Sequence, residues 1–428
     1  MYESLQFYSI SASISMVAIQ ISNIMIHSFS CKNFYSFGDL TTLDFTVNDK
    51  APKNNGYFTT GSGTRLSKVE AVIGPNASGK TNLLRVLPFL KWLIVDSFNM
   101  NPDAPILVQS FAFGEDKDKP IELSVEFEIN DKIYTYDFVL NKQKIISEKL
   151  ESTSFVKEKN ATKKLFSRTW NEAKNGYDFE DTNFELPKGF ENALRMNASV
   201  IGAADRLNHP ESREIATFWR MLETNTVEGG SLRDPLSQAS VPHWFEVLMY
   251  YSDNDVLKKE AEKLLSRFDL GLDGILIDKK QVGNGMMKID VQGLHLFKGQ
   301  KQQLPIQYES AGTKQLFILL KTILKVLGQG GIAVLDEIDV NLHPETVLAL
   351  FDLFVDPNTN SKNAQLLLST HSHLVLSKLD KYQIVLVEKN KDGISESWRL
   401  DEMGSDVRAD DNYYAKYIAG AYGAVPKI

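Results

Sequence analysis

Two kinds of hydrophobic pattern divide the chain. In the first, apolar and polar side chains alternate along three stretches joined by short polar turns, residues 121–129, 132–140 and 143–150. Alternation with a period of two is typical of strands buried on one face, so we expect a meander that begins with a hairpin. Together with a strand expected at residues 25–33, this pattern predicts a β-rich N-terminal lobe over residues 25–150.

The second pattern consists of short continuous apolar runs, separated by segments with helical apolar spacing. The runs are residues 331–335, 365–370 and 383–388, and the helical segments are residues 316–327 and 346–354. Strands that are apolar on both faces and alternate with helices predict a parallel sheet covered by helices. The fold class is therefore α/β, with a second lobe over residues 301–428.

The middle of the chain, residues 151–300, is more polar and less regular. Helical spacing over residues 212–249 and 255–268 predicts a mostly helical insertion that serves as a partner-binding region. A basic run in this region either contacts phosphates of a nucleic acid or forms a solvated surface, and interleaved acidic residues favour the surface. The run consists of Lys157, Lys159, Lys163, Lys164 and Arg168.

Composition limits the classes of protein. The chain has 428 residues, of which 43% are hydrophobic, enough for one large or two ordinary domains. A formal net charge of −8 gives no global basic signature for nucleic acid, although it leaves a local patch open. The single cysteine, Cys31, excludes an internal disulfide framework and a multi-cysteine zinc site, and it suits a cytoplasmic location.

The sequence of residues 1–24 predicts an N-terminal extension that need not be folded. No basic region opens them, as a secretory signal requires, and polar residues interrupt residues 10–26 too often for a membrane helix. We therefore expect a dispensable extension or an upstream translation start, and no association with a membrane.

The strongest chemical motif follows an apolar run and matches the phosphate-loop pattern G-x-x-x-x-G-K-[ST]. Its glycines allow successive backbone N–H groups to point at phosphate oxygens, its lysine reaches the outer phosphates, and its threonine hydroxyl can ligate Mg²⁺. The helix that follows directs its positive end at the anion. The nucleotide-binding residues predicted from this motif are Gly74, Pro75, Asn76, Ala77, Ser78, Gly79, Lys80, Thr81 and Asn82.

Two adjacent carboxylates, Asp336 and Glu337, follow the apolar run at residues 331–335. Like charges this close repel each other and need a cation or hydrogen-bond donors nearby. Asp336 is placed to hold the Mg²⁺ shell, as a Walker B aspartate does, and Glu337 to deprotonate the water that attacks a γ-phosphate.

Two further segments are candidates for the same site. His371 follows the apolar run at residues 365–370, and it would lie near the γ-phosphate as a polar sensor. Ser310 and Gly312 form a Ser-x-Gly turn before a helix, which offers a hydroxyl and free N–H groups to an anion. Taken alone, this turn would be an ordinary helix N-cap.

This order of motifs resembles that of the ABC-type ATPases. Within them, the chain is similar to the AAA-type ATPases related to the OLD (overcoming lysogenization defect) family and to the SMC-type ATPases. Residues 336–344 resemble the D-E-x-D-x-x-L-H-P segment of that subgroup, and residues 25–37 resemble its opening strand, which ends N-F-x-S-F. Residues 417–426 resemble the Y-x-x-G-x-Y-G-A-x-P tail of stand-alone members often encoded in phage-defence operons.

The resemblance implies an ABC-type P-loop ATPase head that binds ATP and Mg²⁺ and forms a homodimer or a higher homo-oligomer. Ser310 and Gly312 would contact the γ-phosphate of the nucleotide held at Lys80 and Thr81 of the other subunit. Gln109 would be the glutamine that senses Mg²⁺. The Ser-Ala-Gly-Thr signature argues against a transporter subunit, because transporters carry Ser-Gly-Gly-Gln.

In function, the resemblance implies an ATP-hydrolysing sensor and scaffold of a bacterial anti-phage defence system, similar to the PARIS, Septu and RloA-like ATPases. It would control a separately encoded toxic effector, such as a nuclease. The few residues after His371 leave no room for a TOPRIM nuclease domain, so we expect no intrinsic nuclease. The alternative is a RecF- or SMC-like DNA-repair ATPase that binds nucleic acid.

Overall fold

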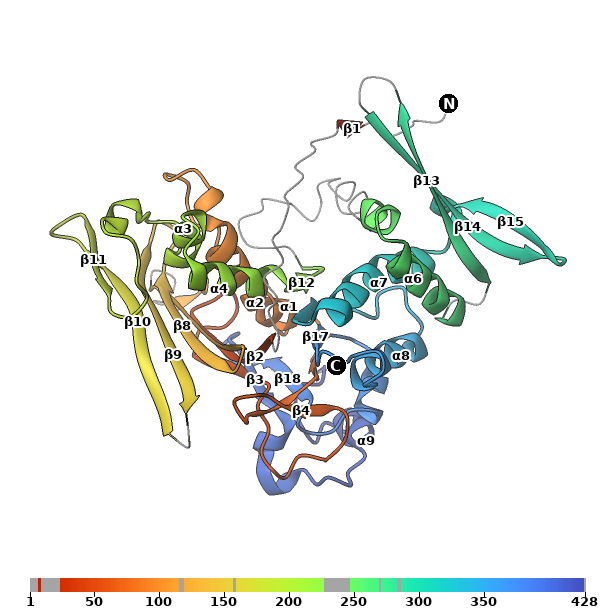
Figure 1. Ribbon diagram of the computed structural model, residues 1–428. Coiled ribbons are helices and arrows are strands. Elements are labelled where there is room, and N and C mark those ends of the chain that lie inside the picture. The colour runs from red at the N-terminus through yellow and green to blue at the C-terminus, as the bar shows by residue number, and fades with distance from the viewer. Residues whose placement is uncertain are drawn as a thin grey trace. The chain divides into compact units, whose positions relative to one another are not determined.

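The computed structural model describes residues 7–8, 24–114, 119–156, 159–226, 247–268, 271–282 and 286–426. The chain divides into two compact units, each described by itself (Figure 1). The larger unit consists of residues 21–232, 326–339 and 347–428. The smaller unit consists of residues 1–20, 233–325 and 340–346.

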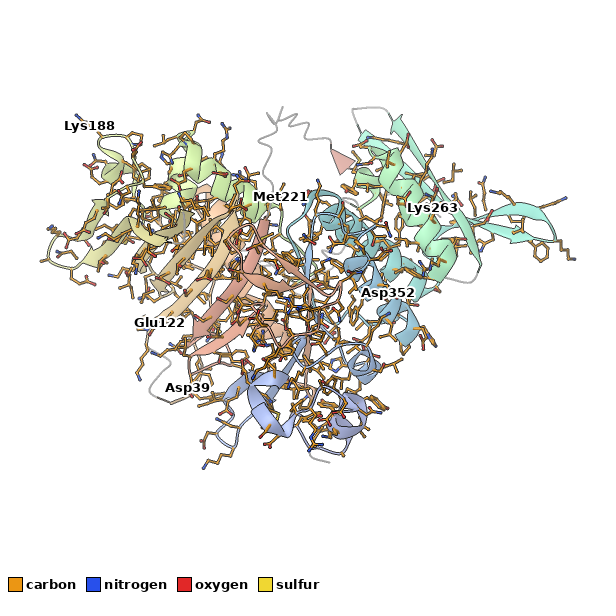
Figure 2. All side chains as sticks on the ribbon, turned by 60° about the horizontal axis from the view of Figure 1, so that its bottom comes forward. Asp39, Glu122, Lys188, Met221, Lys263 and Asp352 are labelled. Atoms are coloured by element: carbon orange, nitrogen blue, oxygen red, sulfur yellow. The ribbon has the colours of Figure 1, made fainter. Side chains whose placement is uncertain are left out.

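A seven-stranded antiparallel sheet forms the β lobe of the larger unit, in the order β11-β10-β9-β8-β7-β2-β3 (Figure 1). Its strands are β2 (Ile24–Lys32), β3 (Thr41–Asp44), β7 (Ile121–Ile129), β8 (Lys132–Leu140), β9 (Ile145–Val156), β10 (Lys159–Asn171) and β11 (Gly176–Asp181). The expected hairpin of β7 and β8 is confirmed. Polar side chains such as Glu122, which pairs across the sheet with Lys32 at 2.9 Å, are exposed (Figure 2).

The prediction of a mostly helical insertion over residues 151–300 is wrong. Strands β9, β10 and β11 continue the β lobe as far as Asp181, and the smaller unit adds two more strands from the same region. Most residues in the distal parts of β9 and β10 are polar, so no alternation of apolar residues marks them as strands. Helices α3 (Val200–Arg206), α4 (Pro210–Arg220) and α6 (Asp255–Phe268) do form, while residues 227–246 lie outside the described part.

A six-stranded sheet carries the second apolar pattern, in the order β12-β16-β17-β6-β18-β19. Its strands are β12 (Glu223–Thr224), β16 (Ile332–Leu335), β17 (Gln365–Ser369), β6 (Val69–Ile73), β18 (Ile384–Lys389) and β19 (Ser395–Arg399). All neighbours are parallel except β18 and β19. The three predicted strands are confirmed, and every residue of β6, β16 and β17 is buried, as a sheet covered on both faces requires.

Helices and short hairpins complete the larger unit. Helix α1 contacts β17 and α2 contacts β2, so these helices link the two sheets. The remaining elements are α1 (Lys80–Leu84), α2 (Val86–Lys91), the π-helical turn η1 (Trp92–Asp96), the 3-10 turns η2 (Ser97–Asn99), η4 (Phe190–Ala193), η6 (His373–Ser377) and η7 (Leu400–Asp406), most of α8 (Pro344–Val355), α9 (Tyr413–Ile418), and the hairpin β4 (Tyr57–Thr59) and β5 (Arg65–Ser67).

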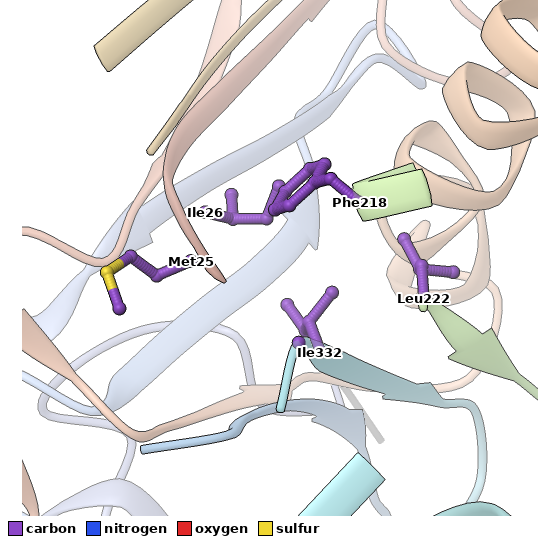
Figure 3. Close-up of a pocket in the computed structure, with 6 residues that line it drawn as sticks. Met25, Ile26, Phe218, Leu222 and Ile332 are labelled. Carbon is purple, nitrogen blue, oxygen red and sulfur yellow. The ribbon is translucent and has the colours of Figure 1, made fainter. Parts of the chain in front are cut away.

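An apolar joint connects the β lobe to the parallel sheet, where β2, α4 and β16 meet (Figure 3). Beside it, the buried side-chain amide of Gln365 clamps Ile26: its Oε1 accepts from the Ile26 N–H at 2.8 Å, and its Nε2 donates to the Ile26 carbonyl at 2.9 Å. The joint carries no chemistry, and it fixes the position of β2 relative to the strands that bear the motifs. Its lining is Met25, Ile26, Phe218, Leu222, Gly331 and Ile332.

The smaller unit combines a sheet with helices. Its strands are β1 (Phe7–Tyr8), β13 (Leu272–Val282), β14 (Met286–Phe297) and β15 (Gln300–Pro305), followed by the 3-10 turn η5 (Ile306–Tyr308). Strand β14 pairs with all of the other three strands. The unit also holds α6 and most of α7 (Ala311–Gln329), which confirms the helices expected there. Of the expected N-terminal extension, residues 7–8 form β1, and residues 1–6 and 9–23 lie outside the described part.

Candidate functional site

The phosphate loop joins β6 to α1 and is packed tightly against β18 and β19. A Cβ on Gly74 would lie 2.0 Å from the carbonyl oxygen of Val387. A Cβ on Gly79 would lie 2.4 Å from Ser395 Oγ, and Gly79 also has a φ of +118°, which strains any residue with a side chain. Local packing therefore requires both glycines of the sequence motif.

Lys80 is the first residue of α1, and the residue is 6% exposed. Its Nζ donates to the carbonyl oxygens of the first two loop residues, at 2.9 Å and 3.0 Å. Burial lowers the pKa of the ammonium group, and the carboxylates of Asp336, Glu337 and Asp339 act in the opposite direction. The ammonium group therefore lies over the loop, within the electrostatic influence of these three carboxylates.

The loop lines a hollow of about 700 Å³ in the larger unit, which is large enough for a nucleotide. The structure brings predicted residues from three distant segments to this pocket, and Lys80, Thr81, Glu337 and His371 are among them. The lining residues are Ser36, Asn76, Ala77, Ser78, Gly79, Lys80, Thr81, Asn82, Glu337, His371 and Lys389. Parallel strands explain the convergence, because their carboxyl ends meet at the same edge of a sheet.

Asp336 is held by two polar side chains that sequence reasoning missed. The amide of Asn225 brackets its backbone: Oδ1 accepts from the Asp336 N–H at 2.7 Å, and Nδ2 donates to the Asp336 carbonyl at 2.9 Å. The hydroxyl of Ser369, the last residue of β17, donates to the Asp336 carboxylate. One carboxylate oxygen of Asp336 is thereby fixed from the neighbouring strand.

Glu337 has a backbone conformation that few residues with a side chain adopt. Its φ is +47°, in the left-handed region, which costs about 1–3 kcal/mol and concentrates at functional sites. The Glu337 N–H donates to Ser369 Oγ at 2.8 Å, which helps to hold this conformation. The carboxylate is 52% exposed and lies 3.8 Å from Nε2 of His371, which is 37% exposed. The His371 N–H donates to Asp339 Oδ1 at 3.0 Å.

The loop is also held by two serines, Ser36 and Ser395. Ser395 Oγ donates to the Ser78 carbonyl at 2.6 Å and accepts from Ser36 Oγ at 2.8 Å. Asn82 Nδ2 donates to Ser36 Oγ at 2.9 Å. Ser36 belongs to the opening-strand motif noted in the sequence, which could have identified it. Ser395 is a buried serine at the start of β19 and belongs to no motif noted in the sequence, so it gave no signal.

Gln109 is not among the residues that line the pocket. Its exposed side chain donates to the Ser110 carbonyl at 3.1 Å and accepts from Lys142 Nζ at 3.5 Å, so its Mg²⁺-sensing role stays a prediction. Ser310 and Gly312 lie in the smaller unit. Ser310 Oγ accepts from the N–H of Thr313, three residues on, at 3.0 Å, which makes it the N-cap of α7.

Gly312 lies in close contact with a neighbouring loop of the smaller unit. A Cβ on Gly312 would lie 2.6 Å from the carbonyl oxygen of Asn341, so only glycine fits against that loop. The structure thus explains the Ser-x-Gly turn as a cap and a close contact within the smaller unit. Its contact with a nucleotide on another subunit stays a prediction.

Two residues of the basic run in the middle region, Arg168 and Lys164, are paired with carboxylates. Arg168 is 1% exposed and forms a buried ion pair with Glu148 at 2.6 Å. Its guanidinium also donates to two backbone carbonyls. Lys164 pairs with Glu180. The interpretation of the run as a solvated surface is therefore wrong for Arg168, and neither residue favours nucleic acid.

Comparison with known proteins gives one family match and several similar solved structures. Residues 71–377 match the family described as "AAA domain, putative AbiEii toxin, Type IV TA system". The SMC head domain from Thermotoga maritima is similar, with a TM-score of 0.39 and 15% identity over 87% of this chain and 98% of that chain. An SmcHead bound to the C-winged helix domain of ScpA gives a TM-score of 0.45 and 13% identity, over 88% and 98%. No curated protein matches the chain.

The matched region runs from the strand before the phosphate loop to beyond His371, and it covers well over half of the chain. The predicted β lobe and the predicted parallel sheet flanked by helices are both present. No helix in the described part of the chain is both long and apolar enough to cross a membrane. The chain belongs to the AAA-domain family whose model it matches, and it is an AAA-type ATPase domain.

Proposed function

We propose that this protein is an ATP-hydrolysing sensor and scaffold of a cytoplasmic anti-phage defence system. It dimerises around ATP and controls a separately encoded toxic effector, such as a nuclease. The observation that carries the ATPase part is a single pocket lined by Lys80, Thr81, Glu337 and His371. The defence part is supported by the family description, which names a toxin and a Type IV toxin–antitoxin system.

The residues of the pocket fit ATP and Mg²⁺. Two glycines let the loop pack against β18 and β19 in the conformation it adopts, and Lys80 presents a cation to the outer phosphates. The hydroxyl of Thr81, which lines the pocket, and the carboxylate of Asp336, the residue before the pocket-lining Glu337, are oxygen ligands of the kind that Mg²⁺ takes, together with substrate phosphates. When bound, Mg²⁺ neutralises charge on the phosphates.

Hydrolysis in this scheme depends on Glu337. Its half-exposed carboxylate faces the pocket, so it can take a proton from the water that attacks the γ-phosphate. His371, 3.8 Å away, orients this carboxylate and senses the γ-phosphate. The strained backbone of Glu337 would aim the side chain into the pocket before the substrate arrives.

Dimerisation is the proposed link from ATP to the effector. The start of α7, with Ser310 and Gly312, would contact the γ-phosphate in the pocket of a second copy. The capped helix offers N–H groups of its first turn to an anion, which supports this role. The effector would bind a surface that changes when ATP closes the pair and when Glu337 opens it again.

The test is a pull-down of tagged protein expressed from its native operon, with and without ATP, followed by mass spectrometry and sizing. Wild type is compared with Glu337→Gln, which should hold the ATP-closed state. The control is Glu191→Gln, an exposed carboxylate outside the nucleotide pocket. We expect a stoichiometric protein partner whose binding differs between wild type and Glu337→Gln but not between wild type and the control.

Two results would contradict the proposal. Nucleic acid as the only stoichiometric partner would favour the RecF- or SMC-like alternative, for which Arg168 and Lys164 give no support. An eluate without any partner in both nucleotide states would remove the scaffold role and leave only the ATPase.

A further inference from the structure

The phosphate loop has a neighbouring strand on each side, and each side delivers a charged residue to the pocket. Strands β17 and β18 both run parallel to β6, which leads into the loop. Glu337 and His371 follow β16 and β17, on one side. Lys389 is the last residue of β18, on the other side, and it lines the same pocket.

From this arrangement we propose that Lys389 is a second nucleotide-binding cation, which contacts the α- and β-phosphates of the bound nucleotide. The inference rests on the proposed ATPase function and adds a residue to its binding site. No sequence motif points to Lys389, because it belongs to neither the phosphate loop nor the Asp-Glu pair.

The strand register places Lys389 beside the loop. Leu386 lies opposite Ile73, the last residue of β6, so Lys389 extends three residues further, alongside the phosphate loop. Its cross-strand partner on β19 is Ser395. Ser395 binds the loop directly through the Ser78 carbonyl, and its N–H donates to the Ser36 carbonyl at 2.9 Å. The backbone that carries Lys389 is therefore fixed against the loop.

The charge of Lys389 is available to a ligand. The side chain is exposed and forms no ion pair with any residue in the described part of the chain. The nearby carboxylates have other partners: Glu388 Oε2 accepts from the Ala424 N–H at 2.9 Å, and Glu396 Oε1 accepts from Asn390 Nδ2 at 2.6 Å. A lysine that faces an anion pocket with no carboxylate partner can bind phosphate as a point charge.

The side of the loop determines which phosphates Lys389 meets. Glu337 and His371 mark the position of the γ-phosphate in the proposed reaction, and they come from the β17 side. Lys389 comes from the opposite side, so the proposal assigns it to the phosphates nearer the ribose. ATP and ADP share these phosphates, and the loss of Lys389 should therefore weaken both nucleotides by the same factor.

The test is an equilibrium titration of ATP and ADP by calorimetry in the Glu337→Gln background, which keeps ATP intact. Lys389→Ala should raise the Kd of both nucleotides by roughly tenfold, the value of one charge-assisted hydrogen bond. Lys389→Arg should restore most of the affinity, because it keeps the charge. The control is Lys391→Ala, a lysine of the adjoining turn that does not line the pocket.

Each other outcome has a distinct meaning. An unchanged Kd in Lys389→Ala would overturn the inference while leaving the ATPase proposal intact, whereas a background protein that binds no ATP would refute the ATPase proposal itself. A higher Kd for ATP with an unchanged Kd for ADP would mean that Lys389 contacts the γ-phosphate. This result would contradict its assignment to the α- and β-phosphates. If Lys389→Ala does not fold, Lys389→Gln replaces it, with the same expected loss of affinity.

Discussion

The two sides of the phosphate loop are built in different ways. On the β17 side, the charged groups Asp336 and Glu337 are held by neighbouring side chains, and Glu337 is held in a strained conformation. On the β18 side, carbonyl and hydroxyl groups press directly on the loop, and the one charged group at the pocket is an exposed lysine. The β17 side is organised for hydrolysis, and the β18 side for holding the nucleotide. Substitutions on the β17 side should therefore lower turnover, and substitutions on the β18 side should lower the affinity for ATP.

The largest effect is expected from Glu337→Gln. Because the amide cannot accept the proton of the attacking water, turnover should fall about a hundredfold or more, while ATP still binds. Phosphate release and equilibrium binding are measured on the same preparation. The matched control is Glu345→Gln, an exposed glutamate at the start of α8, which should retain wild-type turnover. Turnover retained in Glu337→Gln would end the assignment of the general base.

Asn225→Ala should give the next largest loss on the reactive side. It removes both hydrogen bonds that bracket the Asp336 backbone and leaves two part-buried groups without these partners, which costs about 1 kcal/mol. We expect lower turnover, since a small misplacement of catalytic groups is costly. Thermal unfolding and phosphate release are compared with those of Asn358→Ala, an exposed asparagine. Wild-type turnover in Asn225→Ala would show that Asp336 needs no such clamp.

Ser395→Ala tests the retaining side. The substitution removes the hydroxyl that donates to the Ser78 carbonyl and contacts Ser36. A net hydrogen bond contributes about 0.5–1.5 kcal/mol, so we expect the Kd for ATP to rise several-fold. The matched control is Ser397→Ala, two residues further along β19. The buried Oγ of Ser397 has no hydrogen-bond partner among the described residues, so its removal should leave the Kd unchanged. A loss of turnover at saturating ATP in Ser395→Ala would blur the division between the two sides.

The site contains residues that the sequence could predict and residues that it could not. Lys80 and Glu337 lie in local motifs whose chemistry needs those residues at those spacings, and both line the pocket. Lys389 and Asn225 reach the site only because strands distant in sequence become neighbours, and neither lies in a recognisable pattern. Their placement depends on strand order and register, which no window of the sequence contains.

The fold shows the same limit. Strands with a clear alternation or a continuous apolar run, such as β7 and β16, were predicted correctly. The distal halves of β9 and β10 are mostly polar and are held by the hydrogen bonds of the ladder, so they carry no apolar period. Arg168 was expected on a solvated surface because acidic residues interleave the basic run to which it belongs. Its burial depends on Glu148, a partner 20 residues away across the sheet.

The smallest effect concerns the C-terminal tail, which contacts both sides of the loop. Tyr417 packs its ring 5.0 Å from that of His373, two residues beyond His371. Its hydroxyl donates to the Ala424 carbonyl at 2.6 Å. The Ala424 N–H donates to Glu388, the residue before Lys389. Tyr417→Phe keeps the ring and removes only the hydroxyl.

We expect Tyr417→Phe to lower the free energy of unfolding by about 1 kcal/mol, as for the loss of one hydrogen bond, and to speed amide exchange at Ala424. Turnover and ATP affinity should stay at wild-type values, because the ring contact and the Glu388 bond remain. Thermal unfolding, hydrogen exchange and phosphate release decide the outcome, with the exposed Tyr414→Phe on the same helix as control. A fall in both turnover and affinity would mean instead that the tail couples the two sides, and the distinction between reaction and retention would then fail at this element.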